Sequence, residues 1–250
     1  MWSETIGYRD YRPPYLERFF SFVAETIPLT GKEHLLDLGC GVGEVALGFA
    51  PFVATLTGLD LEQPMLDEAF KRARASGRDI RLVHGKVEDT PADLGVYDLI
   101  TMGRSHWFMH NPASLARINQ WLKSGGRILV CLPVENPDGA EWHNVYARVR
   151  SKWAERSIGK LTRLTSEQFF QGTEFVPLER VVVRGQRKLE LEHLIFRSLG
   201  TPTTSSTILG AETDRMTAAL RAALSPYFRN GPIVENHVTL GTIYRRREDP

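Results

Sequence analysis

Residues 34–60 read HLLDLGCGVGEVALGFAPFVATLTGLD, and this stretch decides the fold of the chain. It predicts a strand, a glycine-rich turn, a helix and a second strand, at residues 34–38, 39–43, 44–50 and 54–59. Glycine adopts backbone angles that other residues avoid and has no Cβ, so a ligand can lie directly against the turn. Asp60 follows the second strand about 20 residues after the glycines, where a carboxylate can accept two hydrogen bonds from a ribose diol. The stretch therefore predicts a strand-helix-strand unit that binds a nucleoside.

Two patterns around the turn point to different nucleosides. The run Gly41-Val42-Gly43-Glu44-Val45-Ala46 satisfies the dinucleotide pattern G-x-G-x-x-G/A, which keeps an NAD-dependent oxidoreductase open. Asp37 argues against that interpretation, because it stands two residues before the first glycine, at the carboxyl end of the first strand. Its charge would repel a pyrophosphate and attract a ligand that carries an ammonium group.

The run Asp37-Leu38-Gly39-Cys40-Gly41-Val42-Gly43 resembles the first motif of class I S-adenosylmethionine (SAM)-dependent methyltransferases, which has the form acid-x-G-x-G-x-G. The resemblance implies that the backbone of the turn holds the methionine part of SAM, that Asp37 lies near its amino end and that Asp60 holds the ribose. It also implies S-adenosyl-L-homocysteine as the cofactor product. The turn residues expected at the cofactor are Gly39, Cys40, Gly41 and Gly43.

The same resemblance implies an α/β fold of the Rossmann-like, doubly wound type. Its sheet is expected to have seven mostly parallel strands, the last one antiparallel, with helices on both faces and an inserted helical cap. We expect a single domain over residues 1–250. Its expected parts are an N-terminal lid and helix at 1–30, a cofactor-binding core at 31–135, cap helices and a late strand at 136–232, and a final strand at 233–250. The cap region is loosely similar to methyltransferases that resemble trans-aconitate methyltransferase.

Apolar periodicity predicts the remaining elements. Helices are expected at residues 14–27, 63–76, 111–123, 138–158, 165–171, 189–199 and 211–227. Strands are expected at residues 80–84, 97–102, 127–132, 175–185 and 233–245. The last of these strands carries the polar residues Glu235, His237 and Thr239 on one parity.

Four residues on two segments are implied at the adenine ring. Leu61 and Met65 lie just past the ribose acid, where the family's residues flank the ring, although Met65 also fits an ordinary core position. The run Gly85-Lys86-Val87-Glu88-Asp89-Thr90-Pro91 resembles the family's G-x-x-E/D-x-x-P turn. In the family this turn meets the adenine edge with a backbone amide and a carboxylate, and here the match falls on Val87 and Glu88. A solvated acid is the alternative for Glu88.

The segment Gly103-Arg104-Ser105-His106-Trp107 follows the fourth expected strand. Ligands of open α/β sheets bind beyond the carboxyl ends of the strands, so this segment should face the transferable methyl group. His106 is the candidate catalytic base, since an unperturbed imidazole titrates at about pH 6.5. A packing histidine is the alternative. Arg104 could pair with a substrate carboxylate, Trp107 could shape the pocket, and Gly103 is expected at the cofactor.

The N-terminal segment is a candidate lid. The run Tyr11-Arg12-Pro13-Pro14-Tyr15 is similar to a Tyr/Arg-Pro segment that folds over the cofactor in related methyltransferases. Tyr8, Tyr11 and Arg12 are then expected to touch the cofactor carboxylate or the substrate, because a guanidinium can grip a carboxylate with two hydrogen bonds. The alternative is a solvated leader before the first helix.

Composition limits the partners that we expect. With 31 basic and 30 acidic residues the formal charge is +1, which favours neither nucleic acid nor an anionic membrane. No run of eighteen apolar residues occurs, and the polar start resembles neither a signal peptide nor an anchor. Cys40 and Cys131 are the two cysteines, and we expect both reduced in a cytoplasmic protein. His106 and His110 lack a third ligand, so no metal is expected.

These observations together predict a cytoplasmic SAM-dependent methyltransferase that acts on a small molecule by in-line displacement. The alternatives are an NAD-dependent oxidoreductase and a SAM-binding protein without turnover. The identity of the acceptor, the methylated atom and the oligomeric state stay open.

Overall fold

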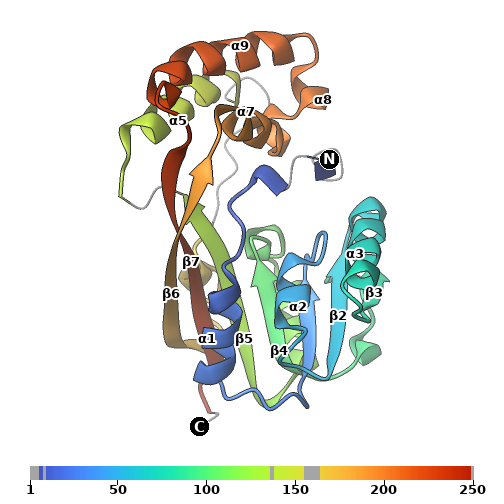
Figure 1. Ribbon diagram of the computed structural model, residues 1–250. Coiled ribbons are helices and arrows are strands. Elements are labelled where there is room, and N and C mark those ends of the chain that lie inside the picture. Colours follow the sequence, from blue (N-terminus) through green and yellow to red (C-terminus); the bar gives the residue numbers. More distant parts are fainter. Residues whose placement is uncertain (1–5, 8–9, 136–137, 155–163, 249–250) are drawn as a thin grey trace. The chain divides into compact units, whose positions relative to one another are not determined.

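The computed structural model describes residues 6–7, 10–135, 138–154 and 164–248. Seven strands form one sheet in the order β3-β2-β1-β4-β5-β7-β6 (Figure 1). Their bounds are β1 (His34–Leu38), β2 (Thr55–Asp60), β3 (Arg81–His84), β4 (Tyr97–Gly103), β5 (Leu122–Glu135), β6 (Phe175–Leu189) and β7 (Ile233–Arg246). The pairs β1 with β2, β1 with β4, β2 with β3 and β4 with β5 are parallel. Figure 1 shows β7 running opposite to its neighbours β5 and β6, so the expected sheet is confirmed.

Nine α-helices are described, and four short 3-10 helices connect the elements. The α-helices are α1 (Glu17–Thr26), α2 (Glu44–Phe49), α3 (Gln63–Ala75), α4 (Pro112–Trp121), α5 (Glu141–Ala154), α6 (Ser166–Phe169), α7 (Leu191–Leu199), α8 (Ser206–Leu209) and α9 (Glu212–Leu224). The 3-10 helices are η2 (Ala92–Leu94), η3 (His106–Phe108), η4 (Pro202–Thr204) and η5 (Ser225–Phe228). Asn111 begins α4, because its side-chain oxygen accepts a hydrogen bond from the Ser114 amide at 2.8 Å.

Some element ends differ from the sequence-based expectation. The expected helix at 138–158 is described only as α5, and residues 155–158 lie outside the described residues. The fifth strand begins at Leu122 instead of Arg127. Tyr97 pairs with Leu122 and Leu99 pairs with Arg127, so the glycine turn expected before the strand is an irregular segment within it.

The chain folds as two compact units. The first unit holds Met1–Pro14, Pro133–Thr162 and Arg184–Val238, and the second holds Tyr15–Leu132, Arg163–Val183 and Thr239–Pro250. The first unit thus contains most of the expected cap and the expected lid. That both units work as one methyltransferase domain stays a prediction.

The second unit packs both faces of its sheet. Leu36 and Ile100 belong to one apolar cluster, and Leu35 and Leu99 belong to another. Neighbouring residues of a strand point to opposite faces, so the two clusters lie on opposite sides of the sheet. Helices α1 and α2 pack into the cluster of Leu35, whereas α4 and α6 pack into the cluster of Leu36. This arrangement confirms helices on both faces.

The first unit has an apolar cluster of its own. Buried side chains of α5, α7 and α9 form it, including Trp142, Leu194 and Leu220. Among the described residues, no helix has both the length and the apolar composition that a bilayer crossing requires.

Candidate active site

The glycine turn between β1 and α2 has a backbone that side chains would strain. Gly39, Gly41 and Gly43 have φ values of 66°, 53° and 81°, in the left-handed region that favours glycine. A Cβ on Gly39 would lie 2.6 Å from the Cβ of Ser105. The Ser105 hydroxyl in turn donates to the Leu38 carbonyl at 2.6 Å. The absent side chain at Gly39 therefore lets the segment after β4 pack against the turn.

Asp60 joins the end of β2 to this turn. Its Oδ2 accepts from the Gly41 amide at 2.7 Å, and its Oδ1 accepts from the Glu62 amide at 2.9 Å. A carboxylate has about four acceptor positions. The two backbone bonds use two of these positions and orient the Asp60 carboxylate against the turn.

Asp37 is buried in β1, with a relative exposure of 1%. Its Oδ1 accepts from the Thr101 hydroxyl at 2.7 Å, and its Oδ2 accepts from the Ala46 amide of α2 at 3.3 Å. Burial raises the pKa of Asp37 to about 7, although both hydrogen bonds oppose that rise. The structure gives Asp37 a role in holding the start of α2, and its nearness to the amino group of a cofactor stays a prediction.

The side chain of Cys40 points toward β2. Its Sγ would lie 2.8 Å from a Cβ built on Gly58 of β2, so the sulfur packs against that strand. Of the two residues expected beside adenine after β2, Leu61 is 56% exposed whereas Met65 is 2% exposed. Leu61 is thus accessible to a ligand. Met65 is buried, as expected from the alternative that it is an ordinary core residue.

The second expected adenine segment follows β3. Val87 is buried in the apolar cluster that also contains Leu36. The Glu88 Oε2 accepts from the Ser114 hydroxyl of α4 at 3.1 Å. The backbone amide of Glu88 itself, with Ser114, holds the pKa of Glu88 below its ordinary value, so the side chain is an oriented carboxylate.

Arg104, directly after β4, has a left-handed backbone with a φ of 59°. Its amide donates to the Cys131 carbonyl at 3.0 Å, and its Nη2 donates to Glu44 Oε2 at 2.7 Å. The guanidinium also lies over the Tyr15 ring, 5.2 Å from its centroid. Gly103 accommodates this packing, since a Cβ there would lie 2.8 Å from the Tyr15 hydroxyl oxygen.

Glu44 and Tyr15 are neighbours of the expected site that sequence reasoning missed. Glu44 was seen only as a position in a glycine pattern, and Tyr15 only as the end of the candidate lid. A charged residue at the first position of the helix after the turn was the signal that could have identified Glu44. The Arg104 guanidinium, predicted to pair with a substrate carboxylate, is partly buried and forms an ion pair with Glu44 at 2.7 Å.

His106 begins η3 and is 3% exposed. Its Nε2 lies 2.9 Å from the Leu164 carbonyl oxygen, which can only accept, so the proton resides on Nε2. Nδ1 then carries a lone pair and has no hydrogen-bond partner among the described residues. Burial lowers the pKa of His106, which keeps the ring neutral. The rings of Trp107 and Phe169 contact it edge-on, at centroid distances of 4.8 and 5.7 Å.

Of the expected lid residues, Tyr11 and Arg12 belong to the first unit, and Tyr8 lies outside the described residues. The Tyr11 ring packs on Phe196 of α7, with centroids 4.9 Å apart. The Arg12 guanidinium donates to the Gly200 carbonyl. Contacts of Tyr11 and Arg12 with a cofactor or substrate stay predictions.

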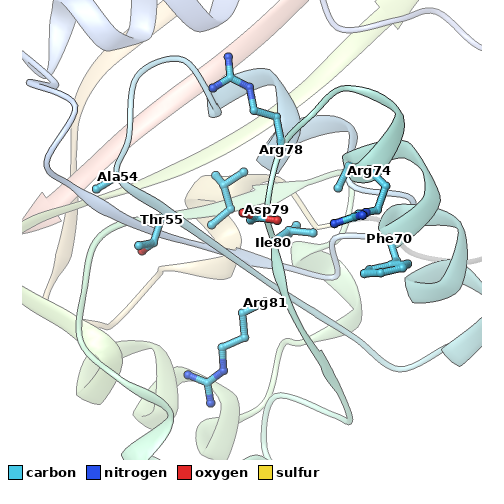
Figure 2. Close-up of a pocket in the computed structure, with 10 residues that line it drawn as sticks. Ala54, Thr55, Phe70, Arg74, Arg78, Asp79, Ile80 and Arg81 are labelled. Atoms are coloured by element: carbon cyan, nitrogen blue, oxygen red, sulfur yellow. The ribbon is translucent and has the colours of Figure 1, made fainter.

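The remaining expected residues lie at or follow the carboxyl ends of β1, β2, β3 and β4, which lie along one edge of the sheet because these strands are parallel neighbours. The strand order reverses between β1 and β4, and such a switch point is where open α/β sheets bind ligands. A cavity of about 370 Å³ lies elsewhere, at the amino ends of β2 and β3 (Figure 2). Phe70, Arg74 and Arg78 help to line it, and none of the expected site residues does.

Comparison with known proteins agrees with this geometry. Residues 35–126 match the family model described as a methyltransferase domain. A demethylmenaquinone methyltransferase from Symbiobacterium thermophilum is 38% identical over 125 residues, which are 46% of this chain and 48% of that protein. Another from Staphylococcus aureus is 29% identical over 141 residues, which are 54% of this chain and 56% of that protein. The chain thus spans about half the length of the curated relatives it matches.

Solved structures resemble nearly the whole chain at low sequence identity. A protein from Anaeromyxobacter dehalogenans, named as a candidate type II methyltransferase, has a TM-score of 0.70 at 19% identity, covering 96% of this chain and 99% of that one. A SAM-dependent methyltransferase from Thiobacillus denitrificans, in complex with S-adenosyl-L-homocysteine, has a TM-score of 0.51 at 18% identity, covering 94% and 93%. At such identities the likeness establishes the fold. Within that fold, residues 35–126 match a methyltransferase domain.

Proposed function

We propose that the chain is a SAM-dependent methyltransferase that moves a methyl group to a small-molecule acceptor by in-line displacement. The observation that carries the proposal is the left-handed glycine turn whose Gly41 amide is held by Asp60. This turn presents backbone without side chains beside an oriented carboxylate. The arrangement fits a ligand that combines an amino acid part with a ribose, and SAM is such a ligand.

The cofactor assignment follows the positions of these residues. The turn of Gly39, Gly41 and Gly43 would hold the methionine part, and Asp60 would accept from the ribose hydroxyls. The exposed Leu61 and the oriented Glu88 would contact adenine. When bound, SAM supplies a methyl group on a positively charged sulfur, which is the electrophile of the reaction.

The chain's own residues contribute position and proton transfer. Alignment of two reactants can supply about 7–11 kcal/mol of a barrier. His106 Nδ1, with its lone pair and no partner among the described residues, is the proposed acceptor for a proton that leaves the nucleophile. The Nε2 proton stays on Nε2, hydrogen-bonded to the Leu164 carbonyl, so the ring need not rotate during transfer.

The proposed class of methyl acceptor is supported by the net charge of the chain and by the names of its curated relatives. A formal charge of +1 gives no attraction for a nucleic acid backbone, and the curated relatives are named for demethylmenaquinone, a small molecule. We therefore propose a small organic acceptor, and a demethylmenaquinone analogue belongs among the first to be assayed. Cytoplasmic residence is part of the proposal, supported by two buried cysteines that are not joined in a disulfide.

Calorimetric titration with S-adenosyl-L-homocysteine and NAD⁺ tests the cofactor. Asp60→Ala should weaken binding of S-adenosyl-L-homocysteine by about tenfold or more, because the ribose hydroxyls lose a charged acceptor. The matched control is Asp67→Ala, which removes an exposed carboxylate of α3 and should leave the affinity unchanged.

Asp60 also holds Gly41, so a second ligand separates the two effects. An analogue of S-adenosyl-L-homocysteine without ribose hydroxyls should bind the unaltered protein weakly and should lose little more affinity in Asp60→Ala. Equal losses for both ligands would show that Asp60 acts only through the turn. Binding of NAD⁺ alone would support the oxidoreductase alternative, and cofactor binding without transfer of a labelled methyl group to any acceptor would support a SAM-binding protein without turnover.

A further inference from the structure

A buried polar cluster in the first unit has no role in the proposed methyl transfer. Its centre is Glu235 of β7, with a relative exposure of 0%. Arg197 of α7 donates from Nη1 to Oε1 at 2.6 Å and from Nη2 to Oε2 at 3.0 Å. Arg187 of β6 donates from Nε to Oε2 at 2.6 Å. Two guanidinium groups thus share one buried carboxylate.

The two arginines differ in how completely their donors are used. Arg197 Nε donates to the Tyr11 carbonyl at 3.1 Å, and its Nη1 also lies 3.3 Å from a carboxylate oxygen of Glu135. Arg187 Nη1 donates to the Arg12 carbonyl at 3.0 Å. Arg187 Nη2, however, is buried and has no acceptor among the residues that the structure describes. A buried donor on a charged group that lacks an acceptor is costly, so a partner is expected.

His237 provides a second set of unused polar atoms. It lies two residues after Glu235, on the same face of β7, and is 2% exposed. Neither ring nitrogen has a well-formed hydrogen bond to a described residue. Burial and the nearby Arg187 guanidinium lower the pKa of His237, so its ring is neutral and offers one N–H donor.

The ion pair between Glu235 and Arg197 uses neither the Nη2 donor of Arg187 nor the ring of His237. Donors on Arg187 and His237 that have no acceptor in the described part of the chain fit a group that carries negative charge. A carboxylate offers two oxygens for two donors. A dianionic phosphate fits less well, because Glu235 and Glu135 belong to the same cluster and would repel it. We propose that Arg187 and His237 bind the carboxylate group of a small organic acid within the first unit.

Calorimetry with benzoate and succinate tests this site, with benzamide as the neutral counterpart of benzoate. The unaltered protein should bind at least one of the two acids at millimolar concentration and should not bind benzamide. Arg187→Gln should weaken that binding by about tenfold or more, because a charged donor is lost. The matched control is Arg184→Gln, which changes an exposed arginine of the same strand and should leave the affinity unchanged. Failure of both acids to bind, or equal affinities for Arg187→Gln and the unaltered protein, would overturn the proposal.

Arg187→Gln also removes a partner of Glu235, so two further measurements guard against a folding defect. His237→Gln should weaken the same binding while it leaves the ion pairs of Glu235 in place. In the unaltered protein labelled with nitrogen-15 at histidine, the bound acid should shift the His237 ring signals, which are identified by their loss in His237→Gln. Ring signals that do not move at saturating acid would contradict the proposal without any variant.

This inference does not depend on methyl transfer, because the acids are titrated without SAM. Should an acid that binds also receive label from methyl-labelled SAM, it is the acceptor of the proposed reaction. An acid that binds and receives no label is a ligand of another kind. That result leaves the proposed function to its own cofactor and label-transfer tests, and the binding data alone decide the carboxylate site.

Discussion

At His106, a single hydrogen bond decides which nitrogen can act as a base. The Leu164 carbonyl holds the proton on Nε2, which leaves Nδ1 as the acceptor. We expect His106→Gln to lower the single-turnover rate by about 100-fold or more, because glutamine can still donate to Leu164 but cannot take up a proton. The affinity for S-adenosyl-L-homocysteine should stay the same.

The control for His106 is His110→Gln, because His110 also lies against the Phe169 ring, at a centroid distance of 5.6 Å, but is exposed. Both rates are measured with the acceptor that the labelled-methyl assay identifies. If the two variants transfer the methyl group equally fast, His106 is a packing residue and the proposed base is wrong.

Asp37 should make the stability of the protein depend on pH. Burial raises its pKa from 3.8 to about 7, so between these values the folded protein binds a proton that the unfolded chain has released. The free energy of unfolding should therefore fall as the pH rises from about 4 to 7, by up to about 4 kcal/mol. Asp37→Asn should lose this dependence, because its amide does not ionise. Urea denaturation of both proteins across this range measures the difference, and parallel curves would show that Asp37 titrates normally.

Among the elements, the glycine turn offers a comparison within the same chain. Gly39 and Gly77 both have a φ of 66°, but only Gly39 has Ser105 against the position of a Cβ. Gly77→Ala should cost about 1–2 kcal/mol of unfolding free energy, from the left-handed backbone alone. Gly39→Ala should cost about 1–3 kcal/mol more, because the new methyl group meets Ser105.

Thermal or urea denaturation measures both glycine variants. Adding Ser105→Gly to Gly39→Ala should recover part of the extra cost, since the clashing Cβ is removed. Equal destabilisation by Gly39→Ala and Gly77→Ala would mean that the segment after β4 is free to move away from the turn.

The same elements show what the sequence could predict. The turn, β1, α2 and β2 were predicted from the spacing of the glycines, Asp37 and Asp60, because this spacing depends on local backbone geometry. The internal role of Asp37 was not predictable, because Thr101, its partner, is 64 residues away. The ion pair of Arg104 with Glu44 was not predictable for the same reason, since the two residues are 60 positions apart, and the role of Arg104 toward a substrate stays a prediction. Interactions between distant residues require the fold before they can be seen.

At the scale of the whole molecule, the two units are interleaved along the chain. The family resemblance implied seven mostly parallel strands with the last one antiparallel, and residues 1–30 were expected in one part. In the structure Met1–Pro14 belongs to the first unit, and the second unit begins at Tyr15. The polar residues Glu235 and His237 were noticed only as one parity of a strand. Their part in a buried polar cluster could not be predicted, because Arg187 and Arg197 of that cluster come from β6 and α7.

The strand order has a consequence for synthesis on the ribosome. In the sheet β7 lies between β5 and β6, yet it is the last of the three to be made. Until residue 246 has left the ribosome, β5 and β6 each have an edge without its final partner. Open edges of this kind pair readily with other chains, so the nascent protein is exposed to aggregation until β7 is complete.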